Sequence, residues 1–315
     1  MNDNNQFLED VLFGLNSKPK KLSSKYFYDK KGDELFQQIM ALDEYYLTRA
    51  EYEIFKTNKQ EILEIFQSRN SEFRLIEFGA GDGYKTKLLL EHFILSQAIF
   101  EYKPIDISQN ALDKLMIDLN GNIPKLNMTA EQGDYFQVLK KLPKLDHKKN
   151  VILFLGSNIG NFTLAEVEKF LIDIRNKIHI GDLLFLGLDL KKNPEKIRTA
   201  YNDKKGVTRD FNLNLLDRIN KELDANFETE SFEHYPSYNP INGECISSLI
   251  STKNQTVTIK GKTFSFEKWE PIHTEISRKF SLSQIEELAL KCGFEIERNL
   301  FDSNQYFVDT IWKAV

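Results

Sequence analysis

Residues 74–85 are Arg-Leu-Ile-Glu-Phe-Gly-Ala-Gly-Asp-Gly-Tyr-Lys, and this stretch decides the fold. Its apolar start is typical of a short buried strand, and the Leu-rich segment that follows is typical of a helix. Gly79, Gly81 and Gly83 lie between the two. Glycine allows a sharp turn and a close approach of the backbone to a ligand, because a Cβ would block that approach. An acidic residue near the end of the strand and a Gly-x-Gly-x-Gly turn suit a ligand that contains adenosine.

Apolar runs of strand length then alternate with helical patterns. We predict strands at residues 75–78, 99–105, 125–131, 151–155 and 183–188, and helices at residues 86–95, 109–120, 135–141 and 164–177. Such alternation is typical of a parallel sheet with crossover helices. After a helix that ends near residue 291, two further strands, 294–301 and 306–315, would close the sheet antiparallel. This ending favours an α/β fold with the Rossmann-like sheet of class I methyltransferases, because dinucleotide folds end on a parallel sixth strand.

Two segments depart from this alternation. Residues 1–54 are mostly helical in pattern, with Asp33 available to cap one helix, and residues 193–277 combine helix with short β-like pieces. The β-like pieces are residues 246–251, 255–259 and 262–266, with a hairpin turn expected at Lys260-Gly261.

The composition is that of an ordinary globular protein, with 41% hydrophobic and 28% charged residues. A net charge of −5 gives no basic face for nucleic acid. Cys245 and Cys292 are too few for a disulfide framework, and the five histidines show no metal-ligand spacing, so we expect no metal site. Neither a secretory signal nor a run of ~18 apolar residues is visible. We therefore expect a cytoplasmic protein without membrane or nucleic-acid partners.

Two acidic positions extend the ligand hypothesis. Asp106 ends the second predicted strand, where its carboxylate can accept both ribose hydroxyls of an adenosine. The alternative role for Asp106 is an N-cap of the next helix, which Ser108 could also provide. At the end of the third strand, Asp134 could accept the exocyclic amine of adenine while Tyr135 lies against the base.

The glycine spacing distinguishes between two cofactors. A nicotinamide dinucleotide needs helix N-terminal amides for its pyrophosphate and favours Gly-x-Gly-x-x-Gly. S-adenosyl-L-methionine (SAM) has no phosphate, and Lys85 could reach its methionyl carboxylate. The observed spacing and the antiparallel ending favour SAM, with S-adenosyl-L-homocysteine (SAH) as the product. A nicotinamide-dependent oxidoreductase remains an alternative.

Segments along nearly the whole chain resemble one family, the histidine-specific SAM-dependent methyltransferases. They are residues 26–32, 44–49, 79–85, 154–161, 200–208, 211–212 and 274–277. The best-known member of the family trimethylates the α-amino group of L-histidine in ergothioneine biosynthesis. The resemblance implies that residues 55–192 and 278–315 form a SAM-binding domain. Residues 1–54 and 193–277 would form a second, discontinuous α+β domain that binds substrate and acts as a lid.

The resemblance also implies roles for individual residues. Its SAM contacts fall on Gly79, Lys85, Asp106, Asp134 and Tyr135, to which the glycine turn adds Gly81. The amino and carboxylate groups of the amino acid would be held by Asn161 and Tyr201. The amine would be surrounded by Tyr28 and Tyr45, with Tyr46 as the alternate of Tyr45, and the imidazole would be recognised by Glu275 and Ser277. The expected catalytic group is therefore Tyr28, Tyr45, Asn161 and Tyr201.

One position departs from the family pattern. The family usually has Met-His-Leu where this chain has Ser247-Ser248-Leu249, and that methionine lines the ring pocket. Another amino acid or an indole-type amine is therefore an alternative acceptor. A non-catalytic SAM-binding protein is a further alternative, against which the substrate residues Asn161, Tyr201 and Glu275 argue. The resemblance suggests a monomer acting on a small-molecule amino acid.

Overall fold

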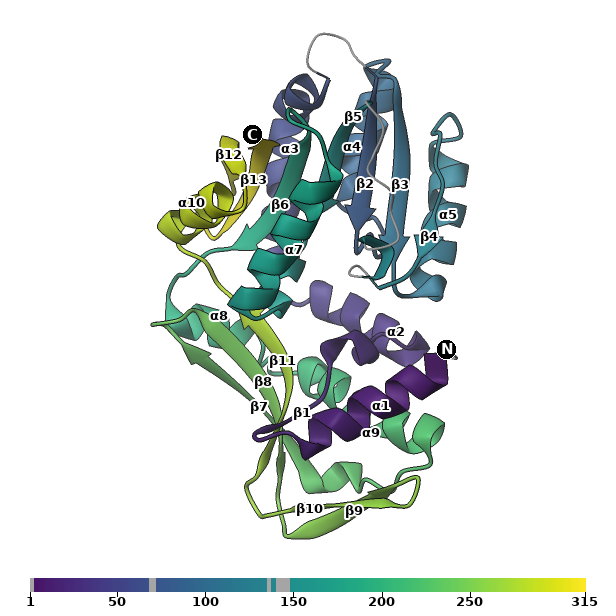
Figure 1. Cartoon of the computed structure of the whole chain (residues 1–315), viewed down its shortest axis with the longest axis vertical. Coiled ribbons are helices and arrows are strands. Elements are labelled where there is room, and N and C mark those ends of the chain that lie inside the picture. Colours follow the sequence, from purple (N-terminus) through teal and green to yellow (C-terminus); the bar gives the residue numbers. More distant parts are fainter. Residues whose placement is uncertain (1–2, 68–71, 135–136, 140–147) are drawn as a thin grey trace. The chain divides into compact units, whose positions relative to one another are not determined.

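The computed structural model describes residues 3–67, 72–134, 137–139 and 148–315 (Figure 1). Contacts divide the chain into two units. The four-stranded unit contains Met1–Tyr46 and Lys192–Ser277, and the seven-stranded unit contains Leu47–Lys191 and Arg278–Val315. The first boundary therefore falls at residues 46/47 and not at 54/55, because helix α3 (Leu47–Phe66) is continuous and contacts α4 and β13 of the seven-stranded unit.

The seven-stranded unit contains one sheet with the strand order β12-β13-β6-β5-β2-β3-β4. Its strands are β2 (Phe73–Phe78), β3 (Phe100–Asp106), β4 (Glu131–Gln132), β5 (Lys149–Phe154), β6 (Leu183–Asp189), β12 (Phe294–Phe301) and β13 (Phe307–Ala314). Strands β2 to β6 pair in parallel, and β13 pairs antiparallel with both β6 and β12. The expected α/β fold with an antiparallel ending is confirmed.

Helices cover both faces of this sheet (Figure 1). They are α3, α4 (Thr86–Leu95), α5 (Gln109–Asn122), α7 (Leu164–Lys177) and α10 (Leu282–Lys291). Alternate residues of a strand point to opposite faces, and β2 places aromatic rings on both. Phe73 packs at 6.0 Å from Phe93 of α4, whereas Phe78 packs at 5.9 Å from Phe170 of α7. The carboxyl ends of the parallel strands carry the loops described below.

One expected strand of this sheet is mostly absent. Residues 125–131 form a single isolated bridge, Tyr102↔Met128, and only Glu131–Gln132 form a strand, β4. This segment lies at the edge of the sheet, where it has one neighbour. Its apolar residues Leu126, Met128 and Ala130 alternate with polar ones, so the pattern is present but the pairing with β3 is not continuous. The helix expected at residues 135–141 lies largely outside the described residues; residues 137–139 are helical.

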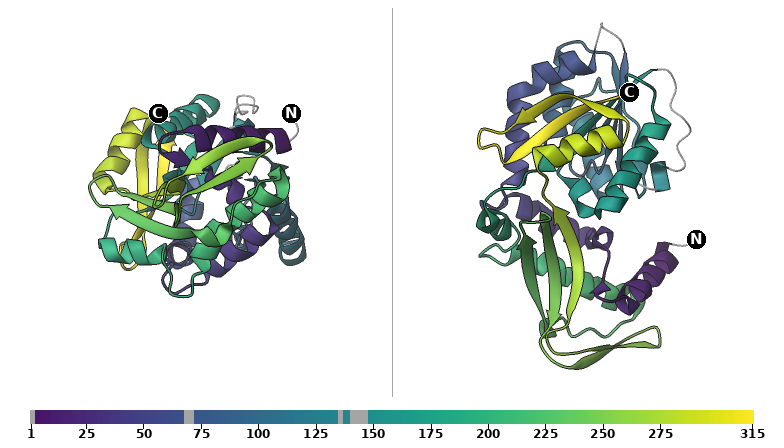
Figure 2. Two further views of the ribbon diagram at one scale, coloured as in Figure 1. Left: turned by 90° about the horizontal axis from the view of Figure 1, so that it is seen from below. Right: turned by 60° about the vertical axis from the view of Figure 1, so that its left-hand side comes forward.

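The four-stranded unit is built on the sheet β1-β11-β8-β7. Its strands are β1 (Lys20–Lys21), β7 (Phe232–Asn239), β8 (Glu244–Ser251) and β11 (Pro271–Arg278), and a separate hairpin contains β9 (Gln255–Ile259) and β10 (Lys262–Phe266). Figure 2 shows β7, β8 and β11 side by side. The hairpin turns at Lys260 and Gly261, which both have positive φ, as the sequence predicted.

Helices α1 (Asp3–Asn16), α2 (Lys30–Met40), α8 (Pro194–Ala200) and α9 (Val207–Leu223) complete the four-stranded unit. The described residues also contain the 3-10 turns η1 (Ser24–Phe27), η3 (Asn158–Asn161) and η4 (Thr229–Ser231). Of these turns, η3 belongs to the seven-stranded unit. The cap expected from Asp33 is wrong: Asp29 caps α2 by accepting the Gly32 amide at 2.7 Å, and Asp33 lies in the first turn. Among the described residues, no helix combines the length and the apolar character needed to cross a membrane.

Candidate active site

The glycine turn after β2 has the backbone that its sequence requires. Gly79, Gly81 and Gly83 have φ angles of 73°, 56° and 65°, a region that other residues rarely adopt. A Cβ on Gly83 would lie 2.3 Å from Leu115 of α5, so this glycine also allows helix packing. A Cβ on Gly81 would meet nothing within 4 Å, so the turn leaves open space there. The turn can therefore be approached closely by a ligand at Gly81.

Asp106 connects this turn to the end of β3. Its Oδ2 accepts the Gly81 amide at 2.8 Å, and its Oδ1 accepts the Ser108 amide at 2.9 Å. The cap of α5 is Ser108, whose side chain accepts the Ala111 amide, so the alternative role of Asp106 as that cap is wrong. Asp106 thus places its carboxylate beside the Gly81 backbone, at the carboxyl end of β3.

Asp134 follows β4 at the same edge of the sheet. Its side chain is half-buried, and its Oδ1 lies 3.3 Å from the Gln137 amide, while its backbone oxygen accepts the Val138 amide at 2.8 Å. The neighbouring candidate, Tyr135, lies outside the described residues.

Lys85, directly before α4, forms an ion pair with Glu51 of α3. Glu51 is completely buried, and its Oε1 accepts the Gly156 amide at 2.7 Å. Burial alone would lower the pKa of Lys85, but the adjacent Glu51 carboxylate outweighs burial and raises it. Lys85 is therefore a cation whose side chain remains 19% exposed.

The sequence analysis missed two buried acidic residues, Glu51 and Asp309, and expected the third, Glu77, only as the acidic residue near the end of the strand. Asp309 of β13 is completely buried, and Glu77 of β2 accepts the hydroxyls of Tyr102 at 2.6 Å and Thr86 at 2.7 Å. Burial raises the pKa of Glu77 to about 7, although the two hydrogen bonds partly offset this increase. Glu51 had a detectable signal, because it takes an apolar position on the buried face of α3, four residues after Leu47 and four before Phe55.

Asn161 ends η3, the turn that follows β5. Gly156 and Ser157, which lead into η3, have φ angles of 71° and 59°, so the chain reverses sharply as it leaves the sheet. Ser157 Oγ accepts the Asp189 amide at 3.1 Å, which fixes this reversal to β6. Asn161 and the glycine turn consequently follow neighbouring parallel strands at the carboxyl edge of the sheet, where α/β proteins bind ligands.

The four-stranded unit brings several predicted substrate residues together. Tyr201 and Ser277 share a hydrogen bond of 2.7 Å between their hydroxyls. The rings of Tyr45 and Tyr201 lie edge to face at 6.2 Å, and Phe36 connects Tyr45, at 6.4 Å, with Tyr28, at 5.7 Å. Tyr28, Tyr45, Tyr201 and Ser277 therefore belong to one cluster, as expected for residues that share a ligand.

Tyr46 lies in a different environment from Tyr45. Its hydroxyl accepts a hydrogen bond from Lys192 Nζ at 2.8 Å, and the ammonium groups of Lys192 and Lys196 lie 4.5 Å and 5.8 Å from its ring centroid. These cation–π contacts occupy the ring of Tyr46. Of the two neighbouring tyrosines, Tyr45 is the one in the aromatic cluster.

Glu275 and Ser247 lie on adjacent strands, β11 and β8. Glu275 and Ser277 are two residues apart and therefore lie on the same face of β11. Thr274 points to the opposite face, where its Oγ1 donates to Asn212 Oδ1 at 2.7 Å and contacts the Ser247 carbonyl at 3.1 Å. Ser247 is buried and Glu275 is half-buried.

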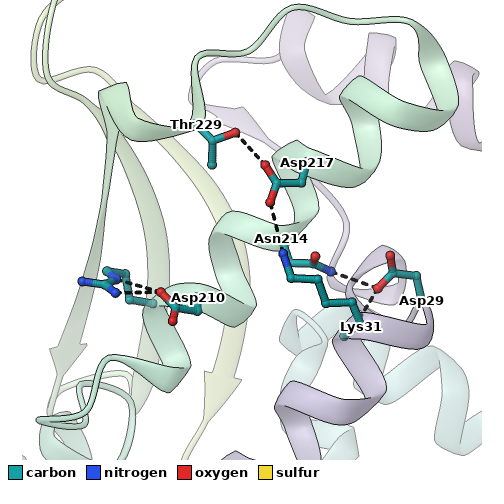
Figure 3. Close-up of polar contacts among 8 residues, drawn as sticks. Asp29, Lys31, Asp210, Asn214, Asp217 and Thr229 are labelled. Carbon is teal, nitrogen blue, oxygen red and sulfur yellow. Dashed lines mark hydrogen bonds and ion pairs between the residues drawn. The ribbon is translucent and has the colours of Figure 1, made fainter.

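Helix α9 fixes the turn that carries Tyr28 (Figure 3). Asp29, directly after Tyr28, accepts Asn214 Nδ2 of α9 at 2.9 Å through the same oxygen that caps α2. Farther along α9, Asp217 accepts Thr229 Oγ1 at 2.8 Å and pairs with Lys31 at 3.3 Å. The position of Tyr28 is thus set by a hydrogen-bonded turn and not by ring packing alone.

Comparison with known proteins gives the family. Residues 7–314 match the family described as "Histidine-specific methyltransferase, SAM-dependent". Proteins named histidine N-alpha-methyltransferase from Mycolicibacterium smegmatis and Mycobacterium tuberculosis are each 34% identical over 86% of this chain and 83% of their own length. A 4-dimethylallyltryptophan N-methyltransferase of Claviceps purpurea is 26% identical over 77% of this chain and 75% of its own length. These matches confirm the expected family and SAM as the cofactor, and they exclude the nicotinamide-dependent oxidoreductase. The chain belongs to the histidine-specific, SAM-dependent methyltransferases.

Proposed function

We propose that this enzyme methylates the α-amino group of free L-histidine, in up to three successive transfers. The observation that carries the proposal is the family match over residues 7–314. The linked hydroxyls of Tyr201 and Ser277, with Glu275 on the face of Ser277, support an acceptor that offers both a carboxylate and a ring N–H.

The seven-stranded unit has the groups that SAM needs. We propose that Gly79 and Gly81 form the open turn beside the cofactor and that Asp106 accepts its ribose hydroxyls. Asp134 and Tyr135 are assigned to the adenine, and Lys85 to the methionyl carboxylate. The open space at Gly81 and the Asp106 carboxylate bound to the Gly81 amide support this assignment. When bound, SAM supplies an activated methyl group on a sulfonium.

For the acceptor, we assign the amino group to Asn161 and the carboxylate to Tyr201. Tyr28 and Tyr45 surround the amine, with Tyr46 at the margin, and their ring faces can attract a methylated ammonium by about 0.5–2 kcal/mol. Glu275 and Ser277 recognise the imidazole. Since only the neutral amine has a lone pair, loss of its proton precedes each transfer, and the rate is expected to rise with pH.

The four-stranded unit is accordingly proposed to bind the substrate and to act as a lid, and the seven-stranded unit to bind SAM. We also propose that the enzyme acts in the cytoplasm as a monomer, without nucleic-acid or membrane partners. Cys245 and Cys292 are both free and buried, which is consistent with a reducing compartment.

A second acceptor class deserves a direct comparison because of Ser247. This small, buried residue occupies the position where the family usually has a methionine, and the Claviceps relative is named for a tryptophan derivative. The same chemistry on another amino acid or an indole-type amine is therefore the second candidate.

One experiment separates these candidates. The purified enzyme is incubated with SAM and a panel of free amino acids that includes histidine and tryptophan, and mono-, di- and trimethylated products are identified by mass spectrometry. Methylated histidine supports the first candidate, and product only on another amino acid supports the second. SAH formation in the complete absence of methylated acceptor, or no product at all, would reject both.

A further inference from the structure

The carboxyl group of Glu51 connects several segments of the seven-stranded unit. The carboxyl belongs to α3 and is 0% exposed. One of its oxygens pairs with Lys85 Nζ, and the other accepts the Gly156 amide at 2.7 Å. The same carboxyl lies beside Gly187 of β6 and Asp309 of β13. Glu51 thus contacts the start of the helix after the glycine turn and the loop after β5 at the same time.

The charges of this cluster balance around the Lys85 ammonium when one of the two carboxyl groups is protonated. Two ionised carboxylates and one ammonium would leave a net negative charge in a buried site, which is costly. Burial raises the pKa of Asp309 well above its usual range, and the Glu51 carboxylate raises it further. This shift favours the protonated form of Asp309 beside the ion pair of Glu51 and Lys85. Neither carboxyl oxygen of Asp309 has a hydrogen-bond partner among the described groups, which also favours the neutral acid over a buried carboxylate.

This arrangement restricts Lys85. A free lysine side chain has ~2 kcal/mol of rotamer entropy, part of which is lost whenever its ammonium is fixed on a ligand. Because Glu51 already holds the ammonium, less is lost on binding an anion, so the site is preorganised. An ammonium has three N–H donors, and the 19% of the Lys85 side chain that stays exposed leaves access for a second anion. A Cβ on Gly156 would lie 3.4 Å from Lys85 Nζ, which places the ammonium beside the loop that leads to Asn161.

We propose that Glu51 is a positioning residue for SAM binding: it holds Lys85 in place for the methionyl carboxylate and fixes the loop after β5 through the Gly156 amide. Asp309 of β13 lies beside the same carboxyl group and completes the cluster. Glu51 acts through Lys85 and touches no cofactor atom itself. The inference rests on the proposed role of Lys85 in SAM binding.

A double-mutant cycle tests the inference. The affinity for SAH is measured by calorimetry for the unaltered chain, Glu51→Gln, Lys85→Met and the double variant. Each single change is expected to weaken SAH binding by about tenfold or more, as for the loss of a charged hydrogen bond. The double variant is expected to bind no more weakly than Lys85→Met alone, because both changes remove the same interaction.

Thermal stability provides a second readout. Lys85→Met leaves Glu51 charged, buried and without its cation, so its melting temperature should fall. Adding Glu51→Gln removes that charge, so the double variant should melt at a higher temperature than Lys85→Met. Two residues with independent structural roles would instead lower the melting temperature additively. This comparison also remains measurable if Glu51→Gln alone fails to fold. The matched control is Asp118→Asn, which breaks the half-buried pair with Lys87 of α4 and should change neither SAH affinity nor its coupling to Lys85.

The outcomes separate this inference from the proposed function. If Glu51→Gln binds SAH like the unaltered chain while Lys85→Met does not, the positioning role is overturned and the cofactor site stands. Losses that multiply in the double variant would also overturn it, because Glu51 would then act independently of Lys85. Failure of the unaltered chain to bind SAH would reject the proposed cofactor site, and this inference with it.

Discussion

The carboxylate of Glu51 occupies the space that a side chain on Gly187 would need. A Cβ on Gly187 would lie 2.2 Å from Glu51 Oε1 and 3.1 Å from Asp309 Oδ1. Gly187 does not have the positive φ that other glycines of this chain adopt. Glycine is therefore required at this position of β6 because a larger side chain would clash with Glu51, and not because of its backbone conformation.

Gly187→Ala is expected to lower the free energy of unfolding by about 1–3 kcal/mol, because the added methyl overpacks a buried site whose neighbours are pinned. It should also weaken SAH binding by displacing Glu51 from Lys85. Urea unfolding and calorimetry measure the two effects. Gly121→Ala is the matched control: its Cβ would meet nothing within 4 Å in α5, so it should be neutral or stabilising. A Gly187→Ala variant with unchanged stability and SAH affinity would contradict the packing described here.

Tyr201→Phe removes the hydroxyl that bonds to Ser277 Oγ at 2.7 Å while retaining the ring that packs on Tyr45. We expect the KM for the amino acid acceptor to rise about tenfold, with the KM for SAM unchanged, because the lost group is assigned to the acceptor carboxylate. Steady-state kinetics with each substrate varied in turn distinguish the two constants. Tyr235→Phe, which alters an exposed tyrosine, should leave both unchanged. An equal rise in both KM values would argue against the assigned role.

Stability should depend on pH through Glu77. The folded-state pKa is about 7, above the ordinary value of 4.5, because the carboxyl is buried. Between these values the folded state retains a proton that the unfolded state has lost, so stability decreases as pH rises through this range. From pH 5 to pH 8, the unaltered chain should lose about 2–3 kcal/mol of unfolding free energy relative to Glu77→Gln, as measured by urea unfolding. The control is Glu64→Gln, at an exposed position on α3, for which the difference in unfolding free energy from the unaltered chain should be the same at pH 5 and pH 8. The same difference at both pH values for Glu77→Gln would refute the prediction.

Asp29→Ala should destabilise the four-stranded unit more than Asp217→Ala does (Figure 3). Asp29 accepts a hydrogen bond from Asn214 of α9, whereas Asp217 belongs to α9 and pairs with Lys31. Asp29 caps α2 and accepts Asn214, so its loss should cost about 1–2 kcal/mol. Asp217 and Lys31 form an exposed pair, whose loss should cost well under about 1 kcal/mol. Chemical denaturation of the two variants gives the comparison, and equal losses would show that the cap contributes nothing beyond surface charge.

The sequence predicted the elements whose start and end are both marked by local chemistry. Helix α7 has the expected bounds, because Thr163 and Glu166 form a capping box before an amphipathic run. The approach of Asp106 to the glycine turn could be expected, since the carboxyl ends of adjacent parallel strands meet. The strand expected at residues 125–131 was wrong, because pairing at a sheet edge depends on a single neighbour.

The cluster around Glu51 could not be predicted in the same way. Glu51 and Asp309 lie far apart in the sequence and meet only when α3 packs on β13, a contact that no local pattern encodes. The expected boundary after residue 54 falls inside α3, which begins at Leu47 and belongs wholly to the seven-stranded unit. A charged residue on the apolar face of a helix indicates a buried partner, but the identity of that partner becomes visible only in the folded structure.

The chain passes from one unit to the other three times, at residues 46/47, 191/192 and 277/278. During synthesis, therefore, neither unit can be finished before the other has been begun. The four-stranded unit waits for β11, which pairs with β1 near the start of the chain. The seven-stranded unit also needs its second segment, because β13 inserts between β6 and β12 although residues 192–277 separate it from β6 in the sequence. Until β13 has been synthesised, the edge of β6 that it covers is exposed to other chains, so we expect this unit to depend on chaperones during that interval.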